Sequence, residues 1–278
     1  MLADLWLLSW DVKRYQRVAK GRDMPYITNN GVKIHYKVEG EGPPIVMLHG
    51  FLASVVDWYD SGYVEQLKDD YQLILIDYRG RGKSDTPHDD AKYSMKLFVD
   101  DIVAILNKLA IERCHFYGQS MGGWFIFGLA KYYPEMVQSI IVAEAAPGLG
   151  FSDWVREILV DFPEFVNSMD DLSIQQKERL LTNDKAALAA MASWGDREAQ
   201  NMIDMVEEVI QSITIPYLML MTDWDTEGEQ FDLMRKTVTT IPNAEVAEFK
   251  ELSHIKLSAS PDLALPKVKE FLATANMQ

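Results

Sequence analysis

Short apolar runs alternate with helical patterns over residues from about 26 to 147 of this 278-residue chain. Residues 32–38 alternate apolar and polar side chains in the manner of a half-buried strand. Further short apolar runs occupy residues 45–48, 73–76, 115–117 and 139–143. Residues 95–109 instead repeat apolar side chains at helical spacing. Strands that alternate with helices predict an α/β fold, in which a mostly parallel sheet carries helices on both faces.

The pattern changes over residues from about 148 to 212, which carry no strand signal and are expected to form several helices. Strand-like runs return at 217–221 and 246–249, and a last helix is expected from about 261 to 273. Because the two outer segments would supply one sheet, we expect a single core made of residues 26–147 and 213–278. The helical segment 148–212 is expected to be a cap inserted into that core.

The first 25 residues form a separate segment. An apolar patch at residues 5–10 precedes a basic stretch at residues 13–20, which is the reverse of the order in a secretory signal. The patch is also too short to span a bilayer. We expect residues 1–25 to form an amphipathic helical extension, with no membrane span, that docks on the body of the protein or on a second subunit of a homodimer.

The charge of the chain narrows the classes of partner. A formal net charge of −15 argues against binding to nucleic acid or to an anionic membrane surface, because both need a basic face. The single cysteine, Cys114, cannot form an intrachain disulfide and begins an apolar run, so we expect a buried, unreactive thiol. Cysteine usage carries no sign of an oxidising compartment, and we expect a cytoplasmic protein.

Neither a metal site nor a cofactor site is expected. The five histidines lack the spacing of paired metal ligands. No glycine-rich loop of the kind that cradles phosphates is present. The expected partner is therefore a small-molecule substrate, processed without a metal ion or a cofactor.

The most specific motif lies where an apolar run meets a helical pattern. Residues 118–123 read Gly-Gln-Ser-Met-Gly-Gly between the two. A sharp strand-to-helix turn would strain the backbone of Ser120 and leave room only for very small residues at Gly118 and Gly122. Such a turn exposes the serine hydroxyl and directs the N–H groups of the helix N-terminus at any oxyanion formed nearby. The motif predicts Ser120 as a nucleophile.

From about residue 26 to its end, the chain resembles the α/β-hydrolase family, and in particular its capped serine hydrolases. Besides the turn at Ser120, the resemblance rests on His49-Gly50-Phe51, on the Asp-x-Arg-Gly-x-Gly-x-Ser segment at residues 77–84, and on a late histidine. It implies an oxyanion hole formed by the backbone N–H groups of Phe51 and Met121. It also implies that His49 and the segment 77–84 are structural.

A serine hydroxyl needs a base to take its proton, and the family order is serine, acid, histidine. His254 alone has the right position, after the last strand-like run and a short loop at residues 251–253. Asp225 is the favoured acid, although Thr222 replaces the glycine that usually fixes the register there. Asp223 is an alternative. Glu144 is another, because it ends a strand from which relatives such as haloalkane dehalogenases supply the acid.

These residues predict a carboxylesterase-like enzyme that cleaves esters through an acyl-serine intermediate. Aromatic residues near the cap are expected to line its pocket, among them Trp124, Phe151 and Trp154, and they favour apolar acyl or aryl substrates. Dehalogenase and epoxide hydrolase chemistry is disfavoured, because both use a carboxylate where Ser120 stands.

Two other functions remain open at this point. One is hydrolysis of carbon–carbon bonds in ring-cleavage products, which uses the same triad and usually an arginine to hold the substrate carboxylate. The cap offers Arg156, Arg179 and Arg197, and no motif chooses among them. The other is a non-catalytic, ligand-binding member of the fold.

Overall fold

The computed structural model describes residues 26–145, 151–222, 229–242 and 244–277. These residues form an eight-stranded sheet with the strand order β1-β2-β4-β3-β5-β6-β7-β8. Strands β3 to β8 run parallel, whereas β2 is antiparallel to both of its neighbours. The strands are β1 (Tyr26–Asn29), β2 (Val32–Glu39), β3 (Pro44–Leu48), β4 (Gln72–Ile76), β5 (Cys114–Gln119), β6 (Val137–Ala143), β7 (Tyr217–Thr222) and β8 (Glu245–Phe249).

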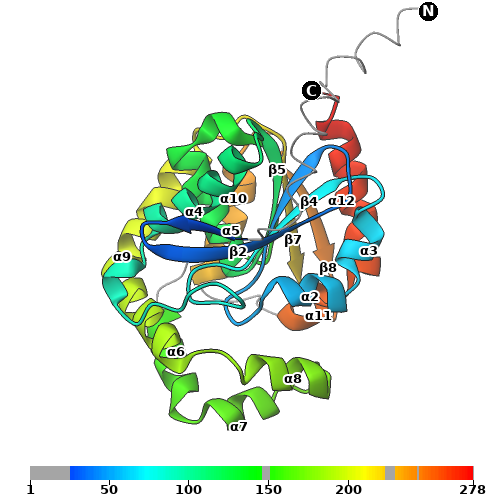
Figure 1. Ribbon diagram of the computed structural model, residues 1–278. Coiled ribbons are helices and arrows are strands. Elements are labelled where there is room, and N and C mark those ends of the chain that lie inside the picture. Colours follow the sequence, from blue (N-terminus) through cyan, green and yellow to red (C-terminus); the bar gives the residue numbers. More distant parts are fainter. Residues whose placement is uncertain (1–25, 146–150, 223–228, 243, 278) are drawn as a thin grey trace, which may run out of the picture.

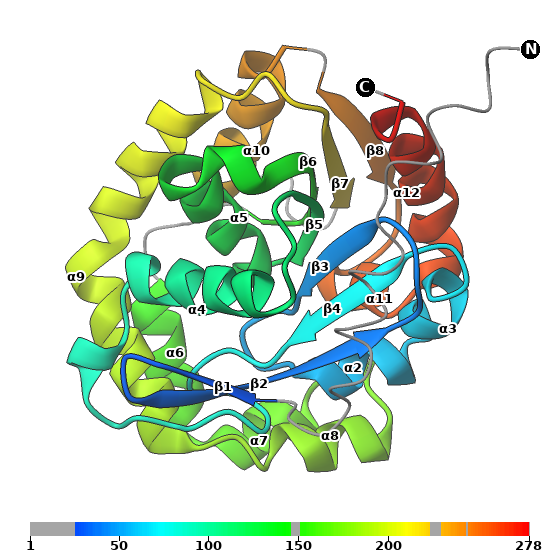
Figure 2. The same ribbon diagram turned by 45° about the horizontal axis from the view of Figure 1, so that its top comes forward.

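Helices cover both faces of the sheet (Figure 2). On one side lie α4 (Met95–Lys108), α5 (Met121–Tyr132), α9 (Lys185–Ile210) and α10 (Glu229–Thr240). The other side carries α2 (Val55–Asp60), α3 (Tyr63–Leu67), α11 (His254–Ser258) and α12 (Pro261–Ala275). The remaining helices are α6 (Phe151–Val160), α7 (Phe162–Asn167) and α8 (Ile174–Leu180), with short 3-10 turns η1 (Asp90–Lys92) and η2 (Pro134–Met136).

Alternation along the strands explains why the protein has one hydrophobic core on each face. In β3, Val46 and Leu48 join the cluster with α4 and α5, whereas Ile45 and Met47 join the cluster with α3 and α12. A parallel strand that is buried on both faces reads as a continuous apolar run, as β3 does. The prediction of a mostly parallel sheet flanked by helices is confirmed.

The hairpin of β1 and β2 was not predicted as such. Asn30 and Gly31 join the two strands, and both have positive φ angles, 48° and 77°. An Asn-Gly pair between two strands favours this kind of tight turn. The signal was therefore present in the sequence, but the four-residue strand β1 is too short to be recognised from periodicity.

The chain leaves the sheet after β6 and returns at β7. In the described residues between them lie α6, α7, α8 and the 26-residue α9. Figure 1 shows α6, α7 and α8 beyond one end of the sheet, with α8 near α2 and α11. This end is the carboxyl end of the parallel strands, because β5 leads directly into Ser120 there. Helices between two neighbouring strands of one sheet are what an inserted cap requires.

Two predictions concern residues that lie outside the part of the chain that the structure describes. The expected helix of residues 1–25 lies outside the described residues, as do Asp223 and Asp225. Within the described ranges, no helix is both long and apolar enough to cross a membrane. Cys114 is fully buried at the start of β5, and burial raises the pKa of its thiol. An unreactive thiol, as expected, follows from that position.

Candidate active site

Ser120 lies between β5 and α5 in a strained backbone conformation. Its φ and ψ angles are 51° and −124°, a region that residues other than glycine rarely occupy. A Cβ atom on Gly118 would lie 2.6 Å from the backbone carbon of Gly122. A Cβ atom on Gly122 would lie 2.2 Å from the carbonyl oxygen of Leu48. Both glycines are therefore required by backbone contacts, as the motif predicted.

The loop that follows β3 lies directly beside Ser120. A Cβ atom at Gly50 would be 3.6 Å from the Cβ of Ser120. The next residue, Phe51, is held by Arg81, whose Nε donates to the Phe51 carbonyl oxygen and whose guanidinium carbon lies 4.5 Å from the centre of the Phe51 ring. Burial lowers the pKa of Arg81 to about 10, so the guanidinium remains charged near neutral pH. Arg81 thus fixes the Phe51 backbone at the site.

Asp77 fixes the far end of the same loop. Its carboxylate accepts hydrogen bonds from the backbone N–H groups of Val55 at 2.7 Å and Lys83 at 3.0 Å. The Nδ1 of His35 lies 2.7 Å from the same carboxylate. Burial alone would raise the pKa of Asp77, but these hydrogen bonds outweigh it and lower the pKa. Asp77 is therefore an ionised structural anchor.

His254 is the first residue of α11, directly after the short loop that follows β8. The N-cap residue, Ser253, accepts a hydrogen bond from the backbone N–H of Lys256, which fixes the start of this short helix. The Nδ1 atom of His254 lies 2.9 Å from Oε2 of Glu144. The imidazole is 38% exposed, whereas the Glu144 side chain is 9% exposed, so a partly open histidine faces a largely buried carboxylate.

Glu144 is held from its other side. It follows β6 directly, with a φ angle of 51°, and its backbone N–H donates to the carbonyl oxygen of Leu220 at 2.9 Å. Its Oε1 accepts hydrogen bonds from the backbone N–H of Thr222 at 2.7 Å and from the Thr222 hydroxyl group. Thr222 therefore orients the carboxylate whose second oxygen, Oε2, lies beside His254.

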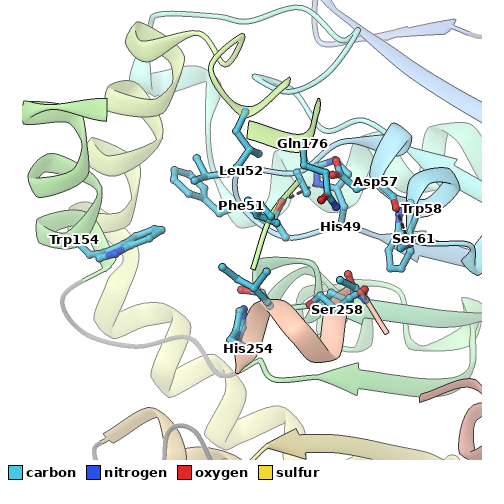
Figure 3. Close-up of a pocket in the computed structure, with 18 residues that line it drawn as sticks. His49, Phe51, Leu52, Asp57, Trp58, Ser61, Trp154, Gln176, His254 and Ser258 are labelled. Atoms are coloured by element: carbon cyan, nitrogen blue, oxygen red, sulfur yellow. Dashed lines mark hydrogen bonds between the residues drawn. The ribbon is translucent and has the colours of Figure 1, made fainter. Parts of the chain in front are cut away.

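The candidate side chains meet at a cavity of about 200 Å³ (Figure 3). Both Ser120 and His254 line it, and so does the loop that contains Phe51. Trp154 from α6 lies at one end of the view, and Trp58 and Ser61 lie at the other (Figure 3). Much of the wall is apolar, formed by Phe51, Leu52, Trp58, Trp154, Leu172, Leu180 and Ile255.

The three predicted pocket aromatics have different positions. Trp154 lines this cavity, whereas Phe151 and Trp124 do not belong to its lining. Phe151 lies behind the cavity wall, with its ring centre 5.0 Å from those of both Phe51 and Trp124. Phe151 thus packs against the Phe51 side chain, and Trp124 packs against Phe151. Sequence periodicity could not separate a lining residue from a supporting one.

The four other histidines lie in different environments from His254. His49 is buried beside the site, with Nδ1 2.8 Å from the carbonyl oxygen of Gly50, and burial lowers its pKa. It shapes the loop, as the resemblance implied. The remaining three contact Asp77 (His35), Asp184 (His88), and both Ser139 and Asn276 (His115).

Two contributors to the site were not found from the sequence. Arg81 belongs to the structural segment 77–84, and its link to Phe51 depends on a contact across 30 positions of the chain. Trp58 lies in α2, a helix too short for a periodic signal. Among the described residues, no group of three or more His, Cys, Asp or Glu side chains could hold a metal ion.

Residues 43–193, more than half of the chain, match the family model for the alpha/beta hydrolase fold. The chain belongs to this family. That membership agrees with the sharp strand-to-helix turn at Ser120, here called the elbow, with the parallel sheet, and with the position of the site at the carboxyl end of the sheet.

Known relatives cover several chemistries. The chain is 26% identical to cis-3-alkyl-4-alkyloxetan-2-one decarboxylase of Shewanella oneidensis, over 89% of this chain and 87% of that protein. It is 30% identical to human epoxide hydrolase 4, over 53% of this chain and 45% of that protein. It also resembles the solved structure of an N-acyl homoserine lactone degrading enzyme, with 25% identity, a TM-score of 0.65, and coverage of 89% of this chain and all of that one.

Proposed function

We propose that this protein is a serine hydrolase that cleaves carboxylic esters, including cyclic ones, through an acyl-enzyme. The Ser120 hydroxyl attacks the ester carbonyl while His254 takes its proton. Collapse of the tetrahedral intermediate breaks the bond to the alcohol oxygen, which receives that proton. Water then attacks the acyl-serine with His254 again as base, releasing the acid and restoring Ser120.

The observation that carries this proposal is the contact of 2.9 Å between His254 Nδ1 and Glu144 Oε2, at a cavity that Ser120 also lines. A carboxylate beside Nδ1 favours the tautomer that has its proton on Nδ1. The other ring nitrogen, Nε2, is then an acceptor for a serine proton. We therefore propose Glu144 as the acid, in preference to Asp225, which the sequence favoured.

The oxyanion is proposed to bind the backbone N–H groups of Phe51 and Met121. Met121 is the first residue of α5, and the first N–H groups of a helix have no partner within it. The contacts of Gly50 with Ser120 and of Arg81 with Phe51 support this assignment, because they fix the second donor close to the nucleophile. Loss of one such donor typically raises the barrier by about 2.7–4 kcal/mol.

The cavity supports a neutral substrate with an apolar part. Its wall is rich in aliphatic and aromatic side chains, and none of its described lining residues is lysine or arginine. Two relatives carry names that refer to lactones, which are internal esters that the same acyl transfer would open.

Carbon–carbon bond hydrolysis receives less support. Each cap arginine that could hold a substrate carboxylate already contacts protein carboxylates: Arg156 contacts Asp153 and Asp196, Arg179 contacts Asp57 and Asp60, and Arg197 contacts Asp90.

Hydrolysis of p-nitrophenyl esters and of γ- and δ-lactones by the wild type, Ser120→Ala and Ser193→Ala tests the proposal. Ser193 lies on α9, outside the cavity lining, and serves as the matched serine control. We expect Ser120→Ala to lose turnover and Ser193→Ala to retain it. Folded wild type that turns over no ester or lactone would favour a non-catalytic role, and activity that survives in Ser120→Ala would refute this nucleophile.

A further inference from the structure

Trp58 has a buried hydrogen-bond donor without an acceptor. The residue is only 1% exposed, and its indole Nε1 has no hydrogen-bond partner among the residues that the structure describes. The rings of Tyr63 and Tyr117 lie against the indole, with centres 5.2 and 5.6 Å away, and hold it in place. A buried N–H group without an acceptor destabilises a folded protein, so it calls for an explanation.

The surroundings of Trp58 suggest what its acceptor is. Trp58 lines the same cavity as Ser120, at the end opposite Trp154 (Figure 3). Polar residues also line the cavity: Ser61 in the turn after α2, which lies beside Trp58 in Figure 3, Gln119 before the nucleophile, and Ser258 at the end of α11. The cavity thus joins an apolar region near Trp154 to a polar region near Trp58.

The charges near Trp58 favour a neutral acceptor. Its neighbour Asp57 also lines the cavity, and the Asp57 carboxylate lies 2.6 Å from a guanidinium nitrogen of Arg179. A second guanidinium nitrogen of Arg179 lies 2.5 Å from the Asp60 carboxylate, so the charge of Arg179 is shared between two carboxylates. Because this cluster has more negative than positive charge, a bound anion would be repelled here. An uncharged oxygen can accept from the indole without that cost.

We propose that Trp58 is a specificity-determining residue that donates its indole N–H to a second, uncharged oxygen of the ester substrate. That oxygen is an ether, hydroxyl or carbonyl group outside the ester being cleaved. The inference rests on the proposed function and narrows its substrate class. The preferred substrate has an apolar part for the Trp154 end and a neutral acceptor for the Trp58 end.

Matched substrates test this directly. One set compares p-nitrophenyl hexanoate with analogues in which an ether oxygen replaces one chain methylene at successive positions. A second set compares hexyl acetate with the corresponding ether alcohol acetates, so the two sets distinguish an acceptor on the acyl side from one on the alcohol side. Each kcat/KM ratio of ether to parent ester is measured in wild type, Trp58→Phe and Trp194→Phe.

Trp194 is the matched control, because its indole Nε1 is also buried and has no partner within the described part of the chain, but the residue does not line the cavity. We expect at least one ether ester whose ratio falls about 2- to 10-fold in Trp58→Phe and stays unchanged in Trp194→Phe, the range for one hydrogen bond. Intrinsic reactivity differences between substrates cancel, since each substrate is compared with itself. Ratios that are equal in wild type and Trp58→Phe for every ether ester would refute the proposal.

A second measurement tests the role of Trp58 even if Trp58→Phe fails to fold or the wild type turns over no ester. Folded Ser120→Ala is titrated with the ether ester and with its parent, and the indole N–H signals of the seven tryptophans are followed by NMR. We expect one indole signal to respond to the ether ester alone. Identical responses to both esters would contradict the role of Trp58. Absence of all ester turnover would contradict the proposed function separately.

Discussion

Glu144 is the carboxylate that lies beside His254 in the structure. It has a positive φ angle, one carboxylate oxygen bound by Thr222, and the other 2.9 Å from His254. The sequence favoured Asp225 because the acid of many relatives follows the strand that corresponds to β7. Strand β6 is the neighbour of β7, with Ala143 paired to Leu220. A carboxylate after either strand therefore reaches the same edge, and sequence order alone cannot choose between them.

Substitution of each candidate acid distinguishes them. We expect Glu144→Gln to lower kcat by about 10³- to 10⁴-fold, because an amide can hold the wrong imidazole tautomer and cannot offset the imidazolium charge. We expect Asp225→Asn to leave kcat within a few-fold of wild type. Steady-state kinetics on one p-nitrophenyl ester measure both. The reverse pattern, with Asp225→Asn the damaging change, would return the role to Asp225.

Among the elements, the site depends on the segments that follow the parallel strands β3, β5, β6 and β8 at the carboxyl end of the sheet. The apolar runs and the Gly118–Gly122 spacing predicted the strands and the elbow, because strand burial and backbone crowding leave local marks in the sequence. The arrangement of the loops could not be predicted from the sequence, because Arg81 and Asp77 fix it through contacts with distant residues. The helical start at His254 was also missed, since α11 has only five residues.

The elbow predicts a position-specific cost for one added methyl group. In Gly122→Ala the new Cβ would meet the backbone oxygen of Leu48, so β3 or α5 must shift. We expect a loss of about 3 kcal/mol or more in the free energy of unfolding, together with a fall in activity. Gly128→Ala in the same helix is the comparison, because its new Cβ would meet the side chains of Met95 and Val99 rather than a backbone atom. Urea unfolding measures both, and an equal cost at the two positions would contradict the prediction.

Asp77 predicts a pH-dependent contribution to stability. Its pKa in the folded protein lies below its usual value, so the ionised carboxylate stabilises the fold above the unfolded-state pKa of about 3.9. That contribution is lost as the pH falls further, through the folded-state pKa. We expect Asp77→Asn to cost about 1.5–3 kcal/mol at pH 7 and less at pH 3. Urea unfolding at the two pH values tests this, and an unchanged difference would rule out Asp77 as the ionised anchor.

At the scale of the whole molecule, a net charge of −15 surrounds a site that lacks lysine or arginine among its described lining residues. The negative electrostatic field that this net charge creates could be predicted from the composition. The fold class could be predicted from the order of strands and helices. The sequence could not predict which aromatic residues of the segment 148–212 line the site, because that depends on how each helix faces the sheet. Trp154 lines the cavity, whereas Trp194 is fully buried on α9. Both are tryptophans in a helical pattern, so the sequence does not distinguish them.

The field predicts discrimination by substrate charge. We expect kcat/KM for p-nitrophenyl butyrate to exceed that for the singly charged p-nitrophenyl hemisuccinate by about tenfold at low ionic strength. The difference should shrink as salt rises from about 0.01 M to 1 M, since salt screens charges over shorter distances. A preference for the anionic ester, or a ratio independent of salt, would be evidence against a neutral substrate class.

We propose Ser120 as the nucleophile of an acyl-transfer site. Incubation with a p-nitrophenyl alkylphosphonate tests it most directly, because a reactive serine displaces p-nitrophenolate and keeps the phosphonyl group. We expect release of one equivalent of p-nitrophenolate per chain and a mass increase that peptide mapping assigns to Ser120, with no labelling of Ser120→Ala. Folded protein that releases no p-nitrophenolate, or a label on another residue, would contradict it.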